Sequence, residues 1–102
     1  MIMEMGRIVN AIEVKTVTVD NQDRKVINNR LAIRINKDQA TFLDFTAWGP
    51  LADFIGEHFN KGDGICLIGK LMNKTVKKEN VEIQTVYLLV EEVQFTPGRK
   101  KE

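Results

Sequence analysis

Hydrophobic and polar residues alternate along several stretches of this chain, and the alternation predicts β-strands. Residues 26–35 show the pattern most clearly, because Arg30 and Arg34 lie on one side of the stretch together with Ala32. Three apolar residues point to the opposite side, which we expect to be buried: Leu31, Ile33 and Ile35. The stretch is therefore predicted to be a half-buried strand with a basic outer face.

Similar patterns predict four more strands. We place them at residues 4–19, with a bend near Asn10, and at residues 41–48, 64–76 and 81–95. Polar stretches rich in Asp, Asn and Lys predict the turns between strands, at residues 19–25, 36–40 and 77–80. Residues 86–90 are apolar at every position, so both sides of the last strand are expected to be covered, for example in a subunit interface.

A single helix is predicted between the third and fourth strands. Five residues recur at the spacing of one helix face: Leu51, Phe54, Ile55, His58 and Phe59. Pro50 suits the first turn of this helix, and Gly62 suits its end. Five strands with one helix in this place predict an all-β OB-fold, a five-stranded Greek-key barrel over residues 1–96 followed by a short polar tail, 97–102. An open α+β sandwich is the alternative.

The strand at residues 41–48 raises a question about its polar side. Phe42 and Trp48 share that side with Asp44 and Thr46, whereas the opposite side carries Leu43, Phe45 and Ala47. Every nucleic-acid base has a π-face, so aromatic rings on an exposed sheet can stack on bases without reading sequence. The alternative is that both rings pack under the helix or in a subunit interface.

The composition is that of one globular domain. The chain has 102 residues, of which 43% are hydrophobic and 28% charged, and its formal net charge is only +1. No apolar run is long enough to cross a membrane and no signal peptide is recognisable, so we expect a cytoplasmic protein. The single cysteine, Cys66, is expected to be buried, and His58 to lie at the edge of the core. The residues contain no metal-binding motif, no phosphate loop and no serine, so we expect no enzyme, metal or cofactor.

Two groups of basic residues are candidates for contacts with phosphates. Arg30 and Arg34 share the outer face of their strand, and Lys37 lies just beyond it. The second group lies on the fourth strand and in the turn that follows: Lys70, Lys74, Lys77 and Lys78. The alternative in both cases is an ordinary solvated surface.

Five short motifs occur in an order that resembles one family. They lie at residues 28–32, 47–53, 61–63, 68–71 and 92–95. Together they resemble the bacterial and phage single-stranded DNA-binding proteins over residues 26–95, whereas the first 25 residues match poorly. The resemblance implies an OB-fold, sequence-tolerant binding of single-stranded DNA, and assembly into a homodimer or homotetramer. Trp48 occupies the position where this family carries a base-stacking aromatic residue. Phe42 occupies a position where the family carries another aromatic residue.

The resemblance has limits that keep other functions open. Val76 and the region near Asn36 stand where members of the family often have an aromatic residue, and residues 97–102 lack the acidic tip that recruits replication and recombination proteins. One alternative is an accessory protein of the primosome type, and another is an OB-fold that binds proteins and no DNA. The low net charge and Val76 favour these alternatives, whereas Phe42 and Trp48 favour DNA.

Overall fold

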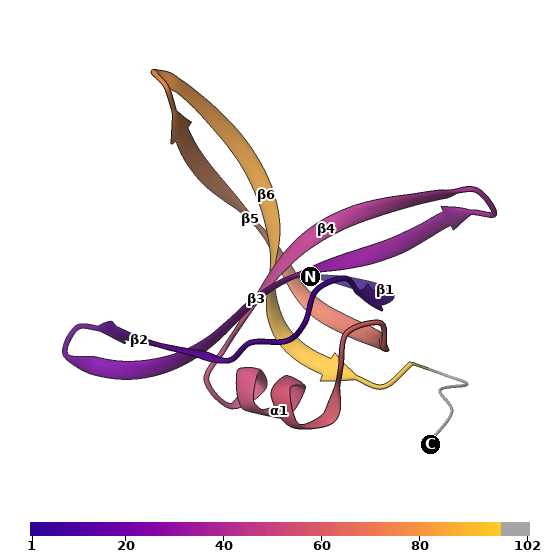
Figure 1. The fold of residues 1–102 in the computed structure, drawn as a ribbon, viewed down its shortest axis with the longest axis horizontal. Coiled ribbons are helices and arrows are strands. Elements are labelled where there is room, and N and C mark those ends of the chain that lie inside the picture. The colour runs from indigo at the N-terminus through magenta and orange to yellow at the C-terminus, as the bar shows by residue number, and fades with distance from the viewer. Residues whose placement is uncertain (97–102) are drawn as a thin grey trace.

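The computed structural model describes residues 1–96, which form six strands and one helix. The elements follow one another as β1 (Ile2–Ile8), β2 (Lys15–Val19), β3 (Gln22–Asn36), β4 (Gln39–Trp48), α1 (Pro50–His58), β5 (Gly64–Lys78) and β6 (Val81–Gln94). The predicted polar tail, 97–102, lies outside the described residues. Figure 1 shows these elements along the chain.

Five of the strands form a nearly closed ring. The strand order is β1-β5-β6-β4-β3-β2, and β1 also pairs with β3 where Arg7 lies opposite Ala32, which brings the two ends of the sheet together. All pairs are antiparallel except β4 with β6. This is the five-stranded Greek-key barrel that the pattern predicted, and the OB-fold prediction is confirmed. The sixth strand, β2, only extends a hairpin with β3.

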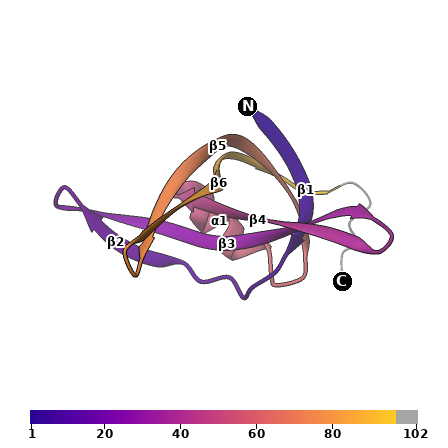
Figure 2. The same cartoon turned by 90° about the horizontal axis from the view of Figure 1, so that it is seen from above.

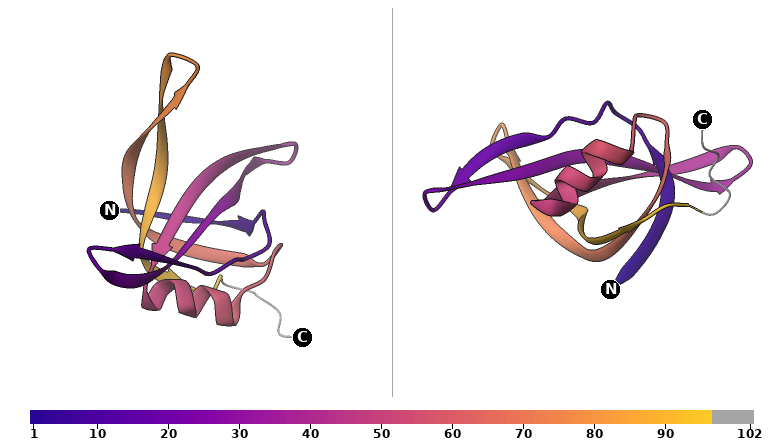
Figure 3. Two further views of the ribbon diagram at one scale, coloured as in Figure 1. Left: turned by 60° about the vertical axis from the view of Figure 1, so that its left-hand side comes forward. Right: turned by 90° about the horizontal axis from the view of Figure 1, so that it is seen from below.

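The core lies inside this ring, and α1 covers one end of it (Figures 2 and 3). Phe45 from β4 and Leu88 from β6 are completely buried, and Ile55 of α1 packs in the same cluster. Pro50 begins the helix, as predicted. The helix ends at His58, earlier than Gly62 led us to expect, because Phe59 already has an extended backbone and Gly62 instead supplies a positive φ of 89° in the following turn.

The prediction of one long first strand over residues 4–19 was wrong. β1 and β2 are separate strands, joined by residues 9–14, which form no strand. Asn29 is the physical reason, since its buried side chain on β3 binds the connecting backbone. Its Nδ2 donates to the Asn10 carbonyl oxygen at 3.1 Å, and its Oδ1 accepts from the Asn10 N–H at 3.2 Å. These bonds satisfy the backbone of Asn10 where strand pairing stops.

The predicted turns were too long, and the hairpins are correspondingly longer. Asp20 and Asn21 have positive φ, as do Glu79 and Asn80, so two-residue turns close the β2–β3 and β5–β6 hairpins. Residues 37–38 alone separate β3 from β4, so that turn is short as well. The β3–β4 and β5–β6 hairpins extend well beyond the barrel and diverge from each other (Figures 1 and 3). Ile35 was predicted to be buried but is 59% exposed, because it lies on the projecting part of β3, beyond the core.

β5 bends where it leaves the barrel to enter its hairpin. The pairing with β6 is irregular between Ile68 and Gly69, which is a β-bulge. A side chain at Gly69 would collide with the carbonyl oxygen of Leu89, so the close approach of the two strands requires glycine there. Residues 86–90 of the facing strand were predicted to be covered on both sides, but only one side is buried. Leu88 and Val90 are buried, whereas Val86 is 48% exposed.

Candidate nucleic-acid interface

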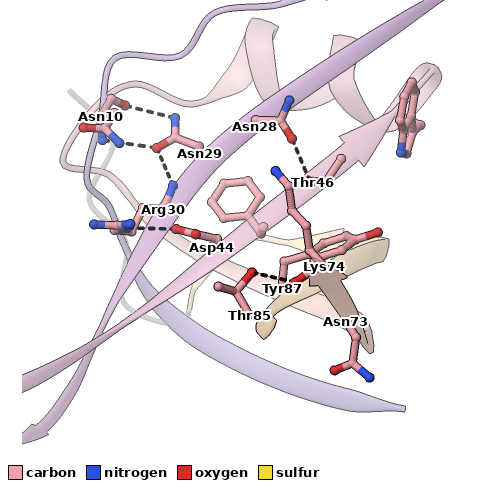
Figure 4. A pocket seen from close by; sticks show the side chains of 12 residues that line it. Asn10, Asn28, Asn29, Arg30, Asp44, Thr46, Asn73, Lys74, Thr85 and Tyr87 are labelled. Atoms are coloured by element: carbon pink, nitrogen blue, oxygen red, sulfur yellow. Dashed lines mark hydrogen bonds and ion pairs between the residues drawn. The ribbon is translucent and has the colours of Figure 1, made fainter. Parts of the chain in front are cut away.

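An open groove of about 660 Å³ lies on the outer face of the barrel, where the β5–β6 hairpin rises beside β3 and β4. Trp48 and Asp44 line it from β4, and Arg30 lines it from β3. Lys74 of β5 and Tyr87 of β6, both labelled in Figure 4, line the other side. The groove therefore combines aromatic rings with cationic side chains, a combination suited to a single-stranded nucleic acid.

Strand alternation places the two predicted aromatics on the outside of the barrel. Phe45 and Ala47 point into the core, so Phe42 and Trp48 point outward and are 57% and 38% exposed. Neither ring packs under the helix. Trp48 lines the groove, whereas Phe42 lies beyond it on the β3–β4 hairpin. The structure thus separates these two candidate stacking residues along one strand.

Arg30 is engaged within the groove by a residue that we did not consider as its partner. Its Nε donates to Oδ1 of Asp44 at 2.8 Å, and both side chains are about half exposed. The hydrogen bond and the charge of Asp44 raise the pKa of Arg30 above its ordinary value. The register explains the pair, because Arg30 lies directly opposite Asp44 in the β3–β4 ladder. A phosphate would meet an arginine that is partly neutralised by its neighbour.

Arg34 and Lys37 lie at the far end of the β3–β4 hairpin and do not line the groove. The guanidinium of Arg34 donates to the carbonyl oxygens of Asn36 and Lys37, at 3.3 and 3.2 Å. Arg34 therefore holds the hairpin turn in place. The structure does not bring these two cations together with Arg30 into one site.

The four candidate lysines are divided between the two faces of the β5–β6 hairpin. Because residues two apart share a face, Lys70, Lys74 and Lys78 lie on one side and Lys77 on the other. Lys77 is 3.6 Å from Glu82, its direct partner across the hairpin. Within residues 1–96, the other three ammonium groups make no ion pair. Their face also carries Thr85 and Tyr87, which line the groove together with Lys74. Lys70 and Lys78 share this face but do not line the groove, and Asn73 lines it from the opposite face.

Several polar groove residues were not singled out from the sequence. Asn28 accepts a hydrogen bond from the Thr46 hydroxyl at 2.7 Å, and Thr85 donates to the Lys74 carbonyl oxygen at 3.2 Å. Asn28 could have been found, since it lies two residues before Arg30 on the same face. Tyr87 could not, because its place in the groove depends on the parallel pairing of β4 with β6, which leaves no local signal.

Other predictions concern chemistry away from the groove. Cys66 is buried, as predicted, and burial together with the charge of Glu92 raises the pKa of its thiol. The His58 ring contacts Phe54 at the edge of the core, with ring centroids 4.6 Å apart and ring planes tilted by 47°. No cluster of three His, Cys, Asp or Glu able to hold a metal occurs in residues 1–96. In the same part of the chain, no helix is long and apolar enough to cross a membrane.

A five-stranded barrel of this topology, with an open aromatic and cationic groove, defines an OB-fold binding protein. The chain belongs to the single-strand binding protein family, which matches residues 1–96. The match includes the first 25 residues, which the motifs alone had left out. Members of this family are binding proteins without enzymatic activity, which agrees with the prediction that the chain is no enzyme.

Two curated relatives are similar to the central part of the chain. A single-stranded DNA-binding protein of Fusobacterium nucleatum is 37% identical over 60 residues, covering 59% of this chain and 39% of the relative. A single-stranded DNA-binding protein of Malacoplasma penetrans is 30% identical over 59 residues, covering 57% of this chain and 31% of the relative. The matched segments thus span less than half of each relative.

Proposed function

We propose that this protein binds single-stranded DNA without sequence preference, in replication, recombination or repair. The observation that carries the proposal is the exposed ring of Trp48 in a groove that also contains Lys74 and Arg30. Family membership supports it, as do two relatives named single-stranded DNA-binding proteins. A flat ring beside flexible cations binds bases and phosphates of any sequence.

We infer that the two walls of the groove have separate tasks. Bases stack on Trp48, and also on Phe42 where the DNA continues along β4. Each stacked base contributes about 1–3 kcal/mol to binding. Phosphates contact Lys70, Lys74 and Lys78 on the facing hairpin, whose ammonium groups make no ion pair in residues 1–96. Arg30 adds a weaker contact because it remains bound to Asp44. The binding energy therefore has a salt-dependent part and a stacking part.

A homo-oligomer, a dimer or a tetramer, is part of the proposal. β1 pairs with β5 along one edge, from Ile2 to Arg7, but with β3 only at Arg7 and Ile8. The rest of that second edge, within the described residues, is open to a strand from another copy of the chain. A sedimentation mass equal to the 11.7 kDa monomer at micromolar concentration would contradict this part.

The direct test is fluorescence anisotropy of a labelled oligo-dT, with duplex DNA and oligo-U as controls. We expect tight binding of oligo-dT at low salt, weaker binding as salt rises, and little affinity for duplex DNA. Failure to bind oligo-dT even at low salt would overturn the proposal. Equal affinity for duplex DNA would contradict the stacking part, because paired bases do not expose their faces.

A protein-interaction module, including an accessory protein of the primosome type, is the second candidate. Exposed apolar side chains on the β5–β6 hairpin favour it, since an exposed apolar patch can mark a protein-interaction site. They are Leu71, Met72, Val76, Val81, Ile83 and Val86. This candidate would be favoured if the protein bound no DNA and captured a replication or recombination protein only when its β5–β6 hairpin was intact.

A further inference from the structure

The two exposed rings on β4 are too far apart to hold neighbouring bases. Phe42 and Trp48 are separated by six residues along one strand, a distance of about 20 Å at the rise of a β-strand. Bases at duplex spacing follow one another at about 3.4 Å. The outer face of β4 between the two rings carries Asp44 and Thr46 and no aromatic residue. Single-stranded DNA that follows β4 would therefore cross a stretch where β4 itself offers no ring for a base to stack on.

Tyr87 lies beside that stretch, on the neighbouring strand. It pairs in parallel register with Asp44, and paired strands are about 4.8 Å apart. The ring is partly exposed and lines the groove, next to Lys74 and Thr85 in Figure 4. Its hydroxyl makes no hydrogen bond to any other residue within 1–96. The chain's only tyrosine thus presents an available ring and an available hydroxyl to the groove.

We propose that Tyr87 is a third base-stacking residue, which bridges the interval between Trp48 and Phe42. This inference rests on the proposed binding of single-stranded DNA. A base on Tyr87 would place its phosphate within reach of Lys74, which shares the same face of the hairpin. Met72 lies directly opposite Tyr87 in the ladder and gives the base an apolar neighbour. The three rings together form one path across β4 and β6.

Photocrosslinking tests this contact directly. An oligo-dT in which single thymines are replaced by 5-iododeoxyuridine is irradiated with the wild-type protein, and mass spectrometry locates the crosslinked residues. We expect crosslinks at Tyr87 as well as at Trp48. Oligonucleotide affinity is then measured for variants: Tyr87→Leu should bind about 5- to 100-fold more weakly, and Tyr87→Phe should stay within about threefold of the wild type.

Val86→Ala provides the matched control, because Val86 is exposed on the opposite face of the same strand. It should leave affinity unchanged. Crosslinks at Trp48 without any at Tyr87, or a folded Tyr87→Leu variant that binds as the wild type does, would overturn the inference while the proposed function stands. If Tyr87→Leu does not fold, the wild-type crosslinks decide alone. A wild-type protein that binds no oligo-dT would instead refute the proposed function itself.

Discussion

The two long hairpins of this barrel look alike in outline but differ in how their charges are used. On the β3–β4 hairpin, Arg30 is bound to Asp44 and Arg34 is bound to the carbonyl oxygens of the turn. On the groove face of the β5–β6 hairpin, Lys70, Lys74 and Lys78 make no ion pair within residues 1–96. Both arginines of the first hairpin are bound within it, whereas the second hairpin offers three lysines to a ligand.

The comparison shows that the same residue types serve different purposes according to register. An arginine directly opposite an aspartate in a ladder stabilises the hairpin and loses part of its value for phosphates. Lysines that alternate with Met72 and Val76 meet no carboxylate across the strand pair, because Glu82 lies on the other face. We therefore assign most phosphate contacts to β5 and most stacking to β4.

Removal of the free lysines should have the largest effect. We expect the triple variant Lys70→Gln, Lys74→Gln, Lys78→Gln to bind oligo-dT roughly a hundredfold more weakly at low salt and to reduce the log–log salt slope by about 2. Anisotropy titrations across a salt series measure both. Lys77→Gln is the matched control and should change little, since Lys77 is bound to Glu82 on the opposite face. A slope unchanged in the triple variant would contradict the division between the hairpins.

Loss of the β4 rings should have the next largest effect and should differ in kind. Trp48→Ala and Phe42→Ala should each weaken binding by about 1–3 kcal/mol while leaving the salt slope unchanged, because stacking releases no counterions. The same salt series measures this. Leu43→Ala, a change on the partly buried inner face of β4, controls for general damage to the strand. A changed salt slope in Trp48→Ala would contradict this, because it would show that the ring acts by positioning basic side chains on phosphates.

Release of Arg30 should have a smaller effect of opposite sign. Asp44→Asn removes a negative charge from the groove and frees the guanidinium, so we expect binding to become about two- to fivefold tighter at low salt. Asp53→Asn is the control, since Asp53 pairs with Lys25 outside the groove. Weaker binding in Asp44→Asn would show that Asp44 orients Arg30 for the phosphate instead of competing with it.

The smallest effect concerns the buried thiol. Because the pKa of Cys66 is raised in the folded protein, its contribution to stability is present below the ordinary thiol pKa and is lost as pH rises through the raised value. Urea unfolding should thus show a decline in wild-type stability above about pH 8.5. Cys66→Ala, which has no thiol to ionise, should decline less over the same range. Equal declines would assign the effect to other groups.

Much of this structure could be predicted from residue patterns because most inward-facing residues of the barrel strands are apolar. Alternation identified β3 and β4 and placed Phe42 and Trp48 outside, and the helical period identified α1. The bend predicted near Asn10 lies where the chain leaves β1. The complete break between β1 and β2 could not be predicted, since it depends on the buried side chain of Asn29 from a distant strand. Ile35 was misplaced because alternation gives a face but not where the core ends.

The site was less predictable than the fold, for a similar reason. The Arg30–Asp44 pair and the separation of Lys77 from the other lysines both depend on cross-strand register. Register follows from turn lengths, and the turns were predicted to be longer than they are. The position of Tyr87 depends on a parallel pairing between strands that are distant in sequence. Pairing of this kind leaves no periodic signal in either strand alone.

The central claim is that single-stranded DNA lies in the groove between β4 and the β5–β6 hairpin. Trp48 is the only tryptophan and lines this groove, so its fluorescence during titration with oligo-dT reports on the claim directly. We predict strong quenching that saturates with binding, is reversed by salt, and is absent with duplex DNA. Binding of oligo-dT that leaves the fluorescence of Trp48 unchanged would contradict the claim.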